Sequence, residues 1–202
     1  YTGELLDHYS VTIKGEWIAY VGNEPDNTIG SNTNVIDVKG KTIIPGLIDG
    51  HTHLVWLSNA SDTLKYIMAG GTTTIITETM EPFPIMGYEG VIDFLGSLSD
   101  QPIKIFATAP SMGSISKKAQ GISKETLKKL LARDDILGLG ESYWQTVLQK
   151  PEEYLPIFAE TLQCGKQLEG HSAGAKKEKL MAYIAAGISS CHEPINNLCN
   201  DT

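Results

Sequence analysis

Six short apolar segments alternate with amphipathic helical patterns from Pro45 onward, and this alternation limits the possible folds more than any other feature of the chain. Each segment has the length of a buried strand and is bounded by glycine or polar residues. Strands that alternate with helices at a spacing of about thirty residues form parallel sheets from βα units. The expected strands are 47–49, 72–77, 103–108, 136–139, 167–169 and 188–190.

Two α/β architectures fit this alternation. A closed (β/α)8 barrel needs about 250 residues, whereas residues 45–202 supply about six βα units. An open doubly wound sheet is the alternative, but no Gly-x-Gly-x-x-Gly follows an expected strand. We therefore predict an α/β fold in which residues 45–202 form a partial (β/α)8 TIM-type barrel.

The first 44 residues have a different pattern. Residues 11–13 and 17–21 are separated by Lys14-Gly-Glu16 and predict a β-hairpin with glycine in its turn. Residues 35–38 and 42–44 predict a second hairpin about Lys39-Gly-Lys41, after a polar stretch rich in turn residues. Residues 1–44 are therefore expected to form a small, partial β-sandwich-type subdomain.

Helix boundary signals lie between the expected strands. Ser123 is suited to cap a helix whose leucines share one face. Pro151 fits a first helical turn, and the acidic residues that follow it lie near the positive end of the helix dipole. Two further amphipathic patterns end at glycine, a common helix terminator; they cover residues 62–69 and 177–186.

Composition excludes several classes of partner. The formal net charge is −8, and no run of Lys or Arg exceeds a pair, which argues against binding nucleic acid through its phosphates. No apolar stretch approaches the ~18 residues that span a bilayer, and the N-terminus lacks a signal-peptide profile. Three cysteines form no paired framework. We therefore expect a cytoplasmic protein without nucleic-acid or membrane partners.

Histidine and glutamate recur at the same place in successive βα units. His51 and His53 follow the first expected strand, Glu141 the fourth, His171 the fifth and His192 the sixth. In a parallel barrel these positions meet at the carboxyl-terminal mouth, where active sites are built. Histidine and carboxylate ligands suit Zn²⁺, Mn²⁺ or Fe²⁺, and one carboxylate can bridge two ions through its two oxygens. The sequence predicts a divalent metal site, with two ions expected.

Three stretches of the sequence resemble a known family. Ile43-Ile-Pro-Gly-Leu-Ile-Asp-Gly-His-Thr-His53 closely resembles the first-strand signature of the amidohydrolase superfamily, whose members are distorted (β/α)8 barrels with one or two divalent metals. The other two stretches resemble the bacterial adenine deaminase family in particular, and they are Gly138-Leu-Gly-Glu141 and Ala182-Tyr-Ile-Ala-Ala-Gly-Ile-Ser-Ser-Cys-His-Glu193.

The resemblance implies specific roles. His51 and His53 would bind one ion, Glu141 would bridge to the second, and His171 and His192 would complete the second site. Glu141 stands where many relatives carry a carboxylated lysine, which favours the adenine deaminase branch. Glu141 and His192 are the implied catalytic residues. Water activated by the metals would attack the C6 carbon of adenine and release ammonia and hypoxanthine, because metal binding lowers the pKa of water from ~15.7 to about 7.

The sequence departs from the family near the expected pocket. Glu78-Thr-Met-Glu-Pro82 replaces an Asp-Pro-His-Glu stretch, and Ser142-Tyr-Trp144 replaces Met-Asn. Glu78, Glu81 and Glu193 are the candidate substrate-binding residues, although Glu78 and Glu81 could instead be solvated loop acids. Tyr143 and Trp144 could contact a substrate or serve in packing. Cys191, at a family aspartate position, is expected to be a small buried residue.

Other functions stay open at this stage. The superfamily uses an aspartate after an eighth strand, and only six strands are expected here, so the sequence indicates a fragment truncated at both ends. The small-molecule substrate is then either a purine base or a cyclic amide, as in dihydroorotase-like and hydantoinase-like amidohydrolases. A catalytically inactive fragment is the third reading. The exposed edges of an unclosed sheet favour a homo-oligomer.

Overall fold

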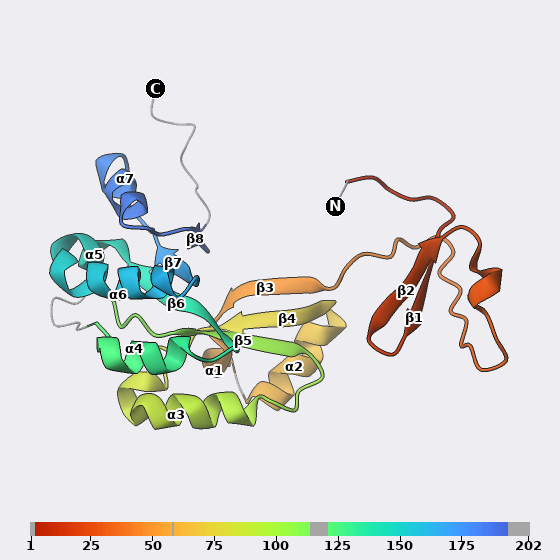
Figure 1. Ribbon diagram of the computed structural model, residues 1–202, viewed down its shortest axis with the longest axis horizontal. Helices are drawn as coiled ribbons and strands as arrows, with labels where there is room; N and C mark the ends of the chain where they lie inside the picture. The colour runs from red at the N-terminus through yellow and green to blue at the C-terminus, as the bar shows by residue number, and fades with distance from the viewer. Residues whose placement is uncertain (1–2, 58, 114–120, 194–202) are drawn as a thin grey trace. The chain divides into compact units, whose positions relative to one another are not determined.

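Six parallel strands form one sheet in the order in which they occur along the chain (Figure 1). The computed structural model describes residues 3–57, 59–113 and 121–193. Each strand pairs in parallel with the next, as successive βα units of a barrel do. The strands are β3 (Leu47–Thr52), β4 (Thr72–Thr77), β5 (Lys104–Ala109), β6 (Ile136–Tyr143), β7 (Gln167–His171) and β8 (Ser190–Cys191).

The sheet is strongly curled. His51 of β3 and Glu169 of β7 are joined by a hydrogen bond of 2.7 Å between Nδ1 and Oε1, although three strands separate β3 from β7. Neighbouring strands lie about 4.8 Å apart, so these two strands would be about 19 Å apart in a flat sheet. Only a curled sheet allows this contact, and the expected partial (β/α)8 barrel is confirmed.

The strands extend further toward the mouth than the sequence indicated. The expected fourth strand ended at Leu139, whereas β6 continues to Tyr143, and β7 continues to His171. Pairing between Ser142 and Gly170 and between Tyr143 and His171 holds these extensions in the sheet. The last strand is shifted, because 188–190 was expected and Ser190–Cys191 is observed. His51, Glu141 and His171 therefore lie within strands, and His53 and His192 directly follow strands.

The expected helices form close to their predicted limits. Ser123 caps α4 by accepting a hydrogen bond of 3.2 Å from Thr126 N–H, and Pro151 occupies the first turn of α6. Asn59 caps the helix that was expected to begin at Asp62. The helices of this unit are α1 (Leu54–Leu57), α2 (Ala60–Ala69), α3 (Phe83–Ser97), α4 (Lys124–Leu131), α5 (Trp144–Gln149), α6 (Pro151–Gln163) and α7 (Glu178–Ala185).

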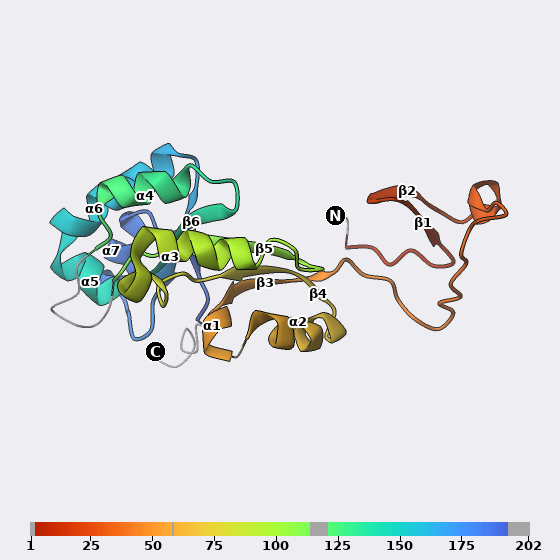
Figure 2. The same cartoon turned by 90° about the horizontal axis from the view of Figure 1, so that it is seen from below.

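Helix α3 was not predicted. Its sequence contains Pro84 and three glycines, and Gly87 interrupts the helix with φ 64° and ψ −157°. Few residues other than glycine adopt a positive φ, so the interruption hides the helical period. Helix α3 lies beside α4, as Figures 1 and 2 show, and Lys129 Nζ of α4 lies 5.9 Å from the centre of the Tyr88 ring.

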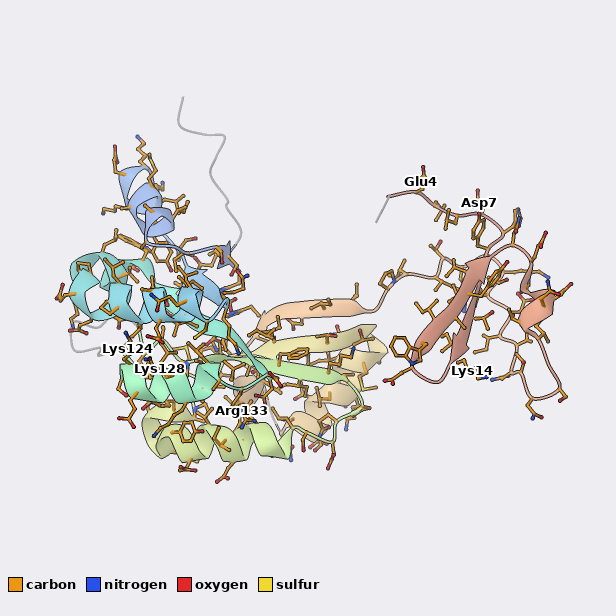
Figure 3. The ribbon with its side chains drawn as sticks, viewed as in Figure 1. Glu4, Asp7, Lys14, Lys124, Lys128 and Arg133 are labelled. Carbon is orange, nitrogen blue, oxygen red and sulfur yellow. The ribbon has the colours of Figure 1, made fainter. Side chains whose placement is uncertain are left out.

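The hydrophobic core lies between the middle strands and the helices that cover them. Strands β5, β6 and β7 contribute fully buried side chains such as Ile136, Leu139 and Leu168, and α4 contributes Leu127 and Leu130. On the surface, Lys124 and Lys128 of α4, labelled in Figure 3, form ion pairs of 2.9 and 3.4 Å with Glu160 of α6. The two lysine side chains are more than half exposed, and ion pairs of surface lysines contribute at most about 1 kcal/mol, so burial of the leucines dominates.

The chain divides into two compact units, Tyr1–Ile44 and Pro45–Thr202. In the first unit, β1 (Ser10–Lys14) and β2 (Trp17–Gly22) form the first expected hairpin, followed by a short 3-10 helix, η1 (Pro25–Thr28). Gly15 sits in the hairpin turn with φ 60°, a value that favours glycine.

The second expected hairpin is wrong. Its turn forms, because Lys41 N–H donates to the Val38 carbonyl at 2.9 Å, but residues 35–38 and 42–44 form no strands. A two-stranded ribbon by itself is at best marginally stable. The first hairpin is joined to η1 by a hydrogen bond of 2.9 Å between Thr12 Oγ1 and Thr28 Oγ1. In the second segment Val35, Ile36, Ile43 and Ile44 are 54% to 74% exposed, so packing does not support strand pairing there.

No helix in the described ranges is long and apolar enough to cross a membrane.

Candidate metal centre

The five predicted metal ligands come from four strands and converge at the carboxyl ends of the sheet. His51 lies in β3 and His53 directly after it, Glu141 lies in β6, His171 ends β7, and His192 follows β8. The curl of the sheet brings these residues within reach of one another. They form two overlapping groups that share Glu141, which we call site A (His51, His53, Glu141) and site B (Glu141, His171, His192).

Site A has the spacing of ligands on a single ion. His51 Nε2 lies 3.3 Å from His53 Nε2, and Glu141 Oε2 lies 3.6 Å from His51 Nε2 and 3.3 Å from His53 Nε2. Two ligand atoms bonded to one tetrahedral zinc ion at about 2.05 Å are about 3.3 Å apart. The three atoms of site A therefore suit one small divalent cation.

Site B uses the other oxygen of the same carboxylate. Glu141 Oε1 lies 2.7 Å from His171 Nδ1, and the ligand atoms of Glu141, His171 and His192 all lie within 4.8 Å of one another. The Glu141 side chain is 4% exposed. One buried carboxylate thus faces both sites, with one oxygen toward each.

The protonation pattern of site A also suits a cation. His51 Nδ1 is hydrogen-bonded to Glu169, and His53 Nδ1 is hydrogen-bonded to Glu81. An imidazole that donates from Nδ1 keeps an electron pair on Nε2 unless it is also protonated there. Both electron pairs face Glu141 Oε2, so the three groups repel one another unless positive charge lies between them.

Site B contains an unsatisfied polar atom. His171 Nδ1 is buried and has no hydrogen-bond partner among the described residues, in spite of its short distance to Glu141 Oε1. Buried polar atoms without a partner are uncommon and call for an explanation, such as an ion. His171 and His192 with Glu141 would hold an ion at this position. Imidazole and carboxylate together suit Zn²⁺, Mn²⁺ or Fe²⁺.

The two histidines that face each other across the sites have opposite pKa shifts. Burial lowers the pKa of His51, but the hydrogen bond to Glu169 and the charges of the surrounding carboxylates outweigh it, so the pKa is raised. Burial and the neighbouring His51 lower the pKa of His192. The rings of His51 and His192 stack with centroids 3.7 Å apart. A neutral His192 therefore fits the role of an electron-pair donor.

Glu78 lies behind the metal ligands rather than in solvent. The residue is 1% exposed, and its Oε1 accepts a hydrogen bond of 3.0 Å from the Glu141 backbone N–H. Burial raises the pKa of Glu78 to about 8. Gly140 makes room for this carboxyl group, because a Cβ at position 140 would collide with Glu78 Oε2. The alternative of a solvated loop acid is wrong for Glu78.

The other two candidate substrate-binding carboxylates also lie at the site. The Glu81 side chain is 13% exposed, so the solvated alternative is wrong here too, and its Oε1 is bonded to His53. Glu193 Oε1 lies 3.2 Å from His171 Nε2. The Oε2 atoms of Glu81 and Glu193 are buried without a hydrogen-bond partner among the described residues. Contact of Glu78, Glu81 or Glu193 with a substrate stays a prediction.

The neighbouring residues that the sequence left open differ in their surroundings. Tyr143 stacks on His171 with centroids 4.1 Å apart, and burial followed by the charge of Glu141 raises its pKa to about 12. Trp144 Nε1–H donates to the Ala173 carbonyl at 2.8 Å, which is a packing role. Cys191 is exposed, so the expectation of a small buried residue is wrong. It lies in the short edge strand β8, where no further strand covers it among the described residues.

Glu169 belongs to the site and was missed from the sequence. Its spacing was the available signal, because Glu169-x-His171 repeats the spacing of His51-x-His53, and residues two apart in a strand share a face. Glu169, His51 and His192 also line a cavity of about 560 Å³ in this unit. Its size lies within the range of small-molecule sites, about 300–1,000 Å³.

Comparison with known proteins agrees with this arrangement. Proteins named adenine deaminase are similar over nearly the whole chain: 34% identity over 198 residues in Dehalococcoides mccartyi and 32% over 201 residues in Moorella thermoacetica, covering 94% and 96% of this chain. One from Cenarchaeum symbiosum is 28% identical over 200 residues and covers 97% of it. The chain spans about a third of the length of these relatives, 33% in each case.

A solved structure shows the same fold. The crystal structure of a protein described as a putative prolidase from Bifidobacterium longum superposes with a TM-score of 0.57 at 19% sequence identity, covering 85% of this chain and 45% of the other. At this identity the likeness concerns the fold alone. The model of the Amidohydrolase family matches residues 42–198, from the residues before β3 to beyond β8. The chain belongs to the amidohydrolase family.

Proposed function

We propose that the protein is the metal-binding part of a binuclear aminohydrolase that converts adenine and water into hypoxanthine and ammonia. The observation that carries this proposal is the position of Glu141. Its two oxygens face two separate histidine pairs, at 3.3 and 3.6 Å on one side and 2.7 Å on the other. A buried carboxylate in this position is suited to bridging two ions.

Each residue of the site then has a defined task. His51 and His53 hold one ion, and His171 and His192 hold the other. Bound divalent ions lower the pKa of water from ~15.7 to about 7, which provides a nucleophile at neutral pH. The chain itself orients this chemistry, because each ligand lies in a strand or directly after one. Groups placed on the rigid elements of a fold are held more precisely than groups on loops.

The choice of adenine rests on the relatives and on the chemistry of the mouth. The proteins reported above, which are similar to this chain over nearly its whole length, are named adenine deaminase. The unpaired Oε2 atoms of Glu81 and Glu193 are suitable acceptors for the N–H groups of a purine base. Separately, the cavity of about 560 Å³ that His51, Glu169 and His192 line is large enough for a single base.

The test is ammonia release from adenine by the complete gene product that carries this chain, loaded with Mn²⁺. We expect equal amounts of ammonia and hypoxanthine, and loss of both in Glu141→Gln. Dihydroorotate and hydantoin serve as parallel substrates for cyclic amide hydrolysis. A protein that binds two ions per chain and releases no ammonia from adenine would overturn the proposal, and ring opening of either cyclic amide would replace it.

Self-association also stays a prediction. The sheet has exposed edges at β3 and β8 among the described residues, and unpaired strand edges favour pairing with another chain. Sedimentation velocity over a range of concentrations tests it, and a single monomeric species at all concentrations would contradict it.

A further inference from the structure

Two glutamates outside the ligand groups A and B contact the far side of the site A imidazoles. Glu169 Oε1 is 2.7 Å from His51 Nδ1, and Glu81 Oε1 is hydrogen-bonded to His53 Nδ1. All four side chains are largely buried, with exposures between 10% and 18%. The same contact is thus made twice, once for each histidine, by carboxylates from different parts of the chain.

These contacts are hydrogen bonds rather than shared coordination. Glu169, His51 and His192 are close enough to form a metal group of their own. However, the contact of 2.7 Å between Glu169 Oε1 and His51 Nδ1 has the geometry of a hydrogen bond, whereas the equally short contact between Glu141 Oε1 and His171 Nδ1 leaves that nitrogen without a hydrogen-bond partner among the described residues. The Glu169–His51 contact also matches the length of a charge-assisted N–H···O bond, about 2.7–2.9 Å. The proton therefore lies on Nδ1.

A proton on Nδ1 decides where the second nitrogen points its electron pair. With both Nδ1 atoms bonded to carboxylates, both Nε2 atoms face the space beside Glu141 Oε2, at 3.3 and 3.6 Å. The opposite tautomer would direct two N–H groups at that space and exclude a cation. Partners of this kind fix ring orientation and increase ligand basicity, and their loss costs about 10–100-fold in metal affinity.

The two partners come from elements that only the fold brings together. Glu169 lies in β7, 118 residues from His51, and Glu81 lies between β4 and α3, 28 residues from His53. Glu169 reaches His51 because the sheet curls, and Glu81 reaches His53 through the loop after β4. Formation of the barrel and preparation of the metal site are thereby coupled.

We propose that Glu169 and Glu81 are a matched pair of positioning residues that hold His51 and His53 in the Nδ1–H tautomer and so prepare site A for its ion. The inference rests on the metal centre of the proposed function and adds to it the residues that control its affinity. For Glu81 it assigns Oε1 to His53 and leaves Oε2 free for a substrate.

The test measures tautomers directly. Long-range ¹H–¹⁵N correlation spectra of histidine-labelled, metal-free protein distinguish Nδ1–H from Nε2–H rings. We expect His51 and His53 of the wild type to be Nδ1–H. Glu169→Gln should change the His51 pattern alone, and Glu81→Gln should change the His53 pattern alone. Neutral wild-type rings that carry their single proton on Nε2 would overturn the inference without any variant.

The second readout is affinity for Zn²⁺, measured by competition with a chromophoric chelator. We expect Glu169→Gln and Glu81→Gln each to weaken Zn²⁺ binding at site A by about 10–100-fold. Glu78→Gln is the matched control, because it removes a buried carboxyl 3.8 Å from His51 Nδ1 that makes no hydrogen bond to the ring. It should leave the tautomers unchanged. Variants that keep both the wild-type tautomer and an affinity within about twofold would overturn the inference.

These outcomes are separate from those of the adenine assay. Tautomer and Zn²⁺ measurements need neither adenine nor turnover, so they can succeed when adenine is not a substrate. Far-UV circular dichroism of each variant identifies one that does not fold, and the other glutamate then tests the same proposal at the other histidine. Restoration of the tautomer and of part of the affinity by Glu169→Asp or Glu81→Asp would support a positioning role for the carboxylate.

Discussion

Replacing Glu78 with glutamine should change how the stability of the metal-free protein depends on pH. Glu78 is 1% exposed, and burial raises its pKa from 4.5 to about 8. Glutamine has nearly the same shape as a protonated glutamate and retains an oxygen that can accept the Glu141 N–H. The substitution therefore removes the ionisation of Glu78 while preserving its hydrogen bond.

The sign and size follow from the two pKa values. Because the folded-state pKa is raised, the contribution of Glu78 to stability is fully present below about pH 4.5 and is lost as pH rises through 8. Within this window the unfolded chain releases a proton that the folded chain retains. Each pH unit then costs about 1.4 kcal/mol. Between pH 5 and 8 the wild type should lose between about 3 and 4 kcal/mol more than Glu78→Gln.

Urea unfolding, followed by far-UV circular dichroism at half-unit intervals of pH in the presence of EDTA, provides the measurement. The difference between wild type and variant isolates Glu78, because the nearby histidines titrate in both proteins. We expect the variant to be the less sensitive of the two to rising pH. Parallel stability curves from pH 5 to 8 would show that Glu78 ionises normally in the folded protein and would refute the reasoning.

Four further substitutions test the site and the fold. Glu141→Gln should leave far-UV circular dichroism unchanged and remove at least one bound ion per chain by elemental analysis, and unchanged stoichiometry would refute the bridging role. Gly138→Ala should cost ~2 kcal/mol or more in urea unfolding, because the new Cβ would overlap the backbone of β7. Gly96→Ala, in open space within α3, should instead stabilise the protein by about 1 kcal/mol. Equal changes in the free energy of unfolding for Gly138→Ala and Gly96→Ala would contradict this expectation. Ser123→Ala should destabilise α4 by about 1 kcal/mol through loss of its cap, and a neutral result would contradict the capping role.

Local patterns accounted for much of the barrel unit. Buried strands and capped helices are decided by neighbouring residues, so Ser123 and Pro151 marked the starts of α4 and α6. The regular recurrence of histidine and glutamate after the strands also indicated which residues would meet, because parallel strands end at a common edge. Prediction failed where local signals were mixed, as at Gly87 in α3, or where strand pairing needed a packing partner, as in residues 35–44.

By itself, the sequence determined the parallel α/β class, the alternation of its elements and the set of residues that converge on sites A and B. The tertiary structure alone decided which carboxylates lie behind the metal ligands. Glu169 reaches His51 across three intervening strands because the sheet curls, and Glu78 is buried only because Gly140 leaves it room. Hydrogen bonds between residues more than a hundred positions apart depend on the curvature and register of the whole sheet, which no local pattern encodes.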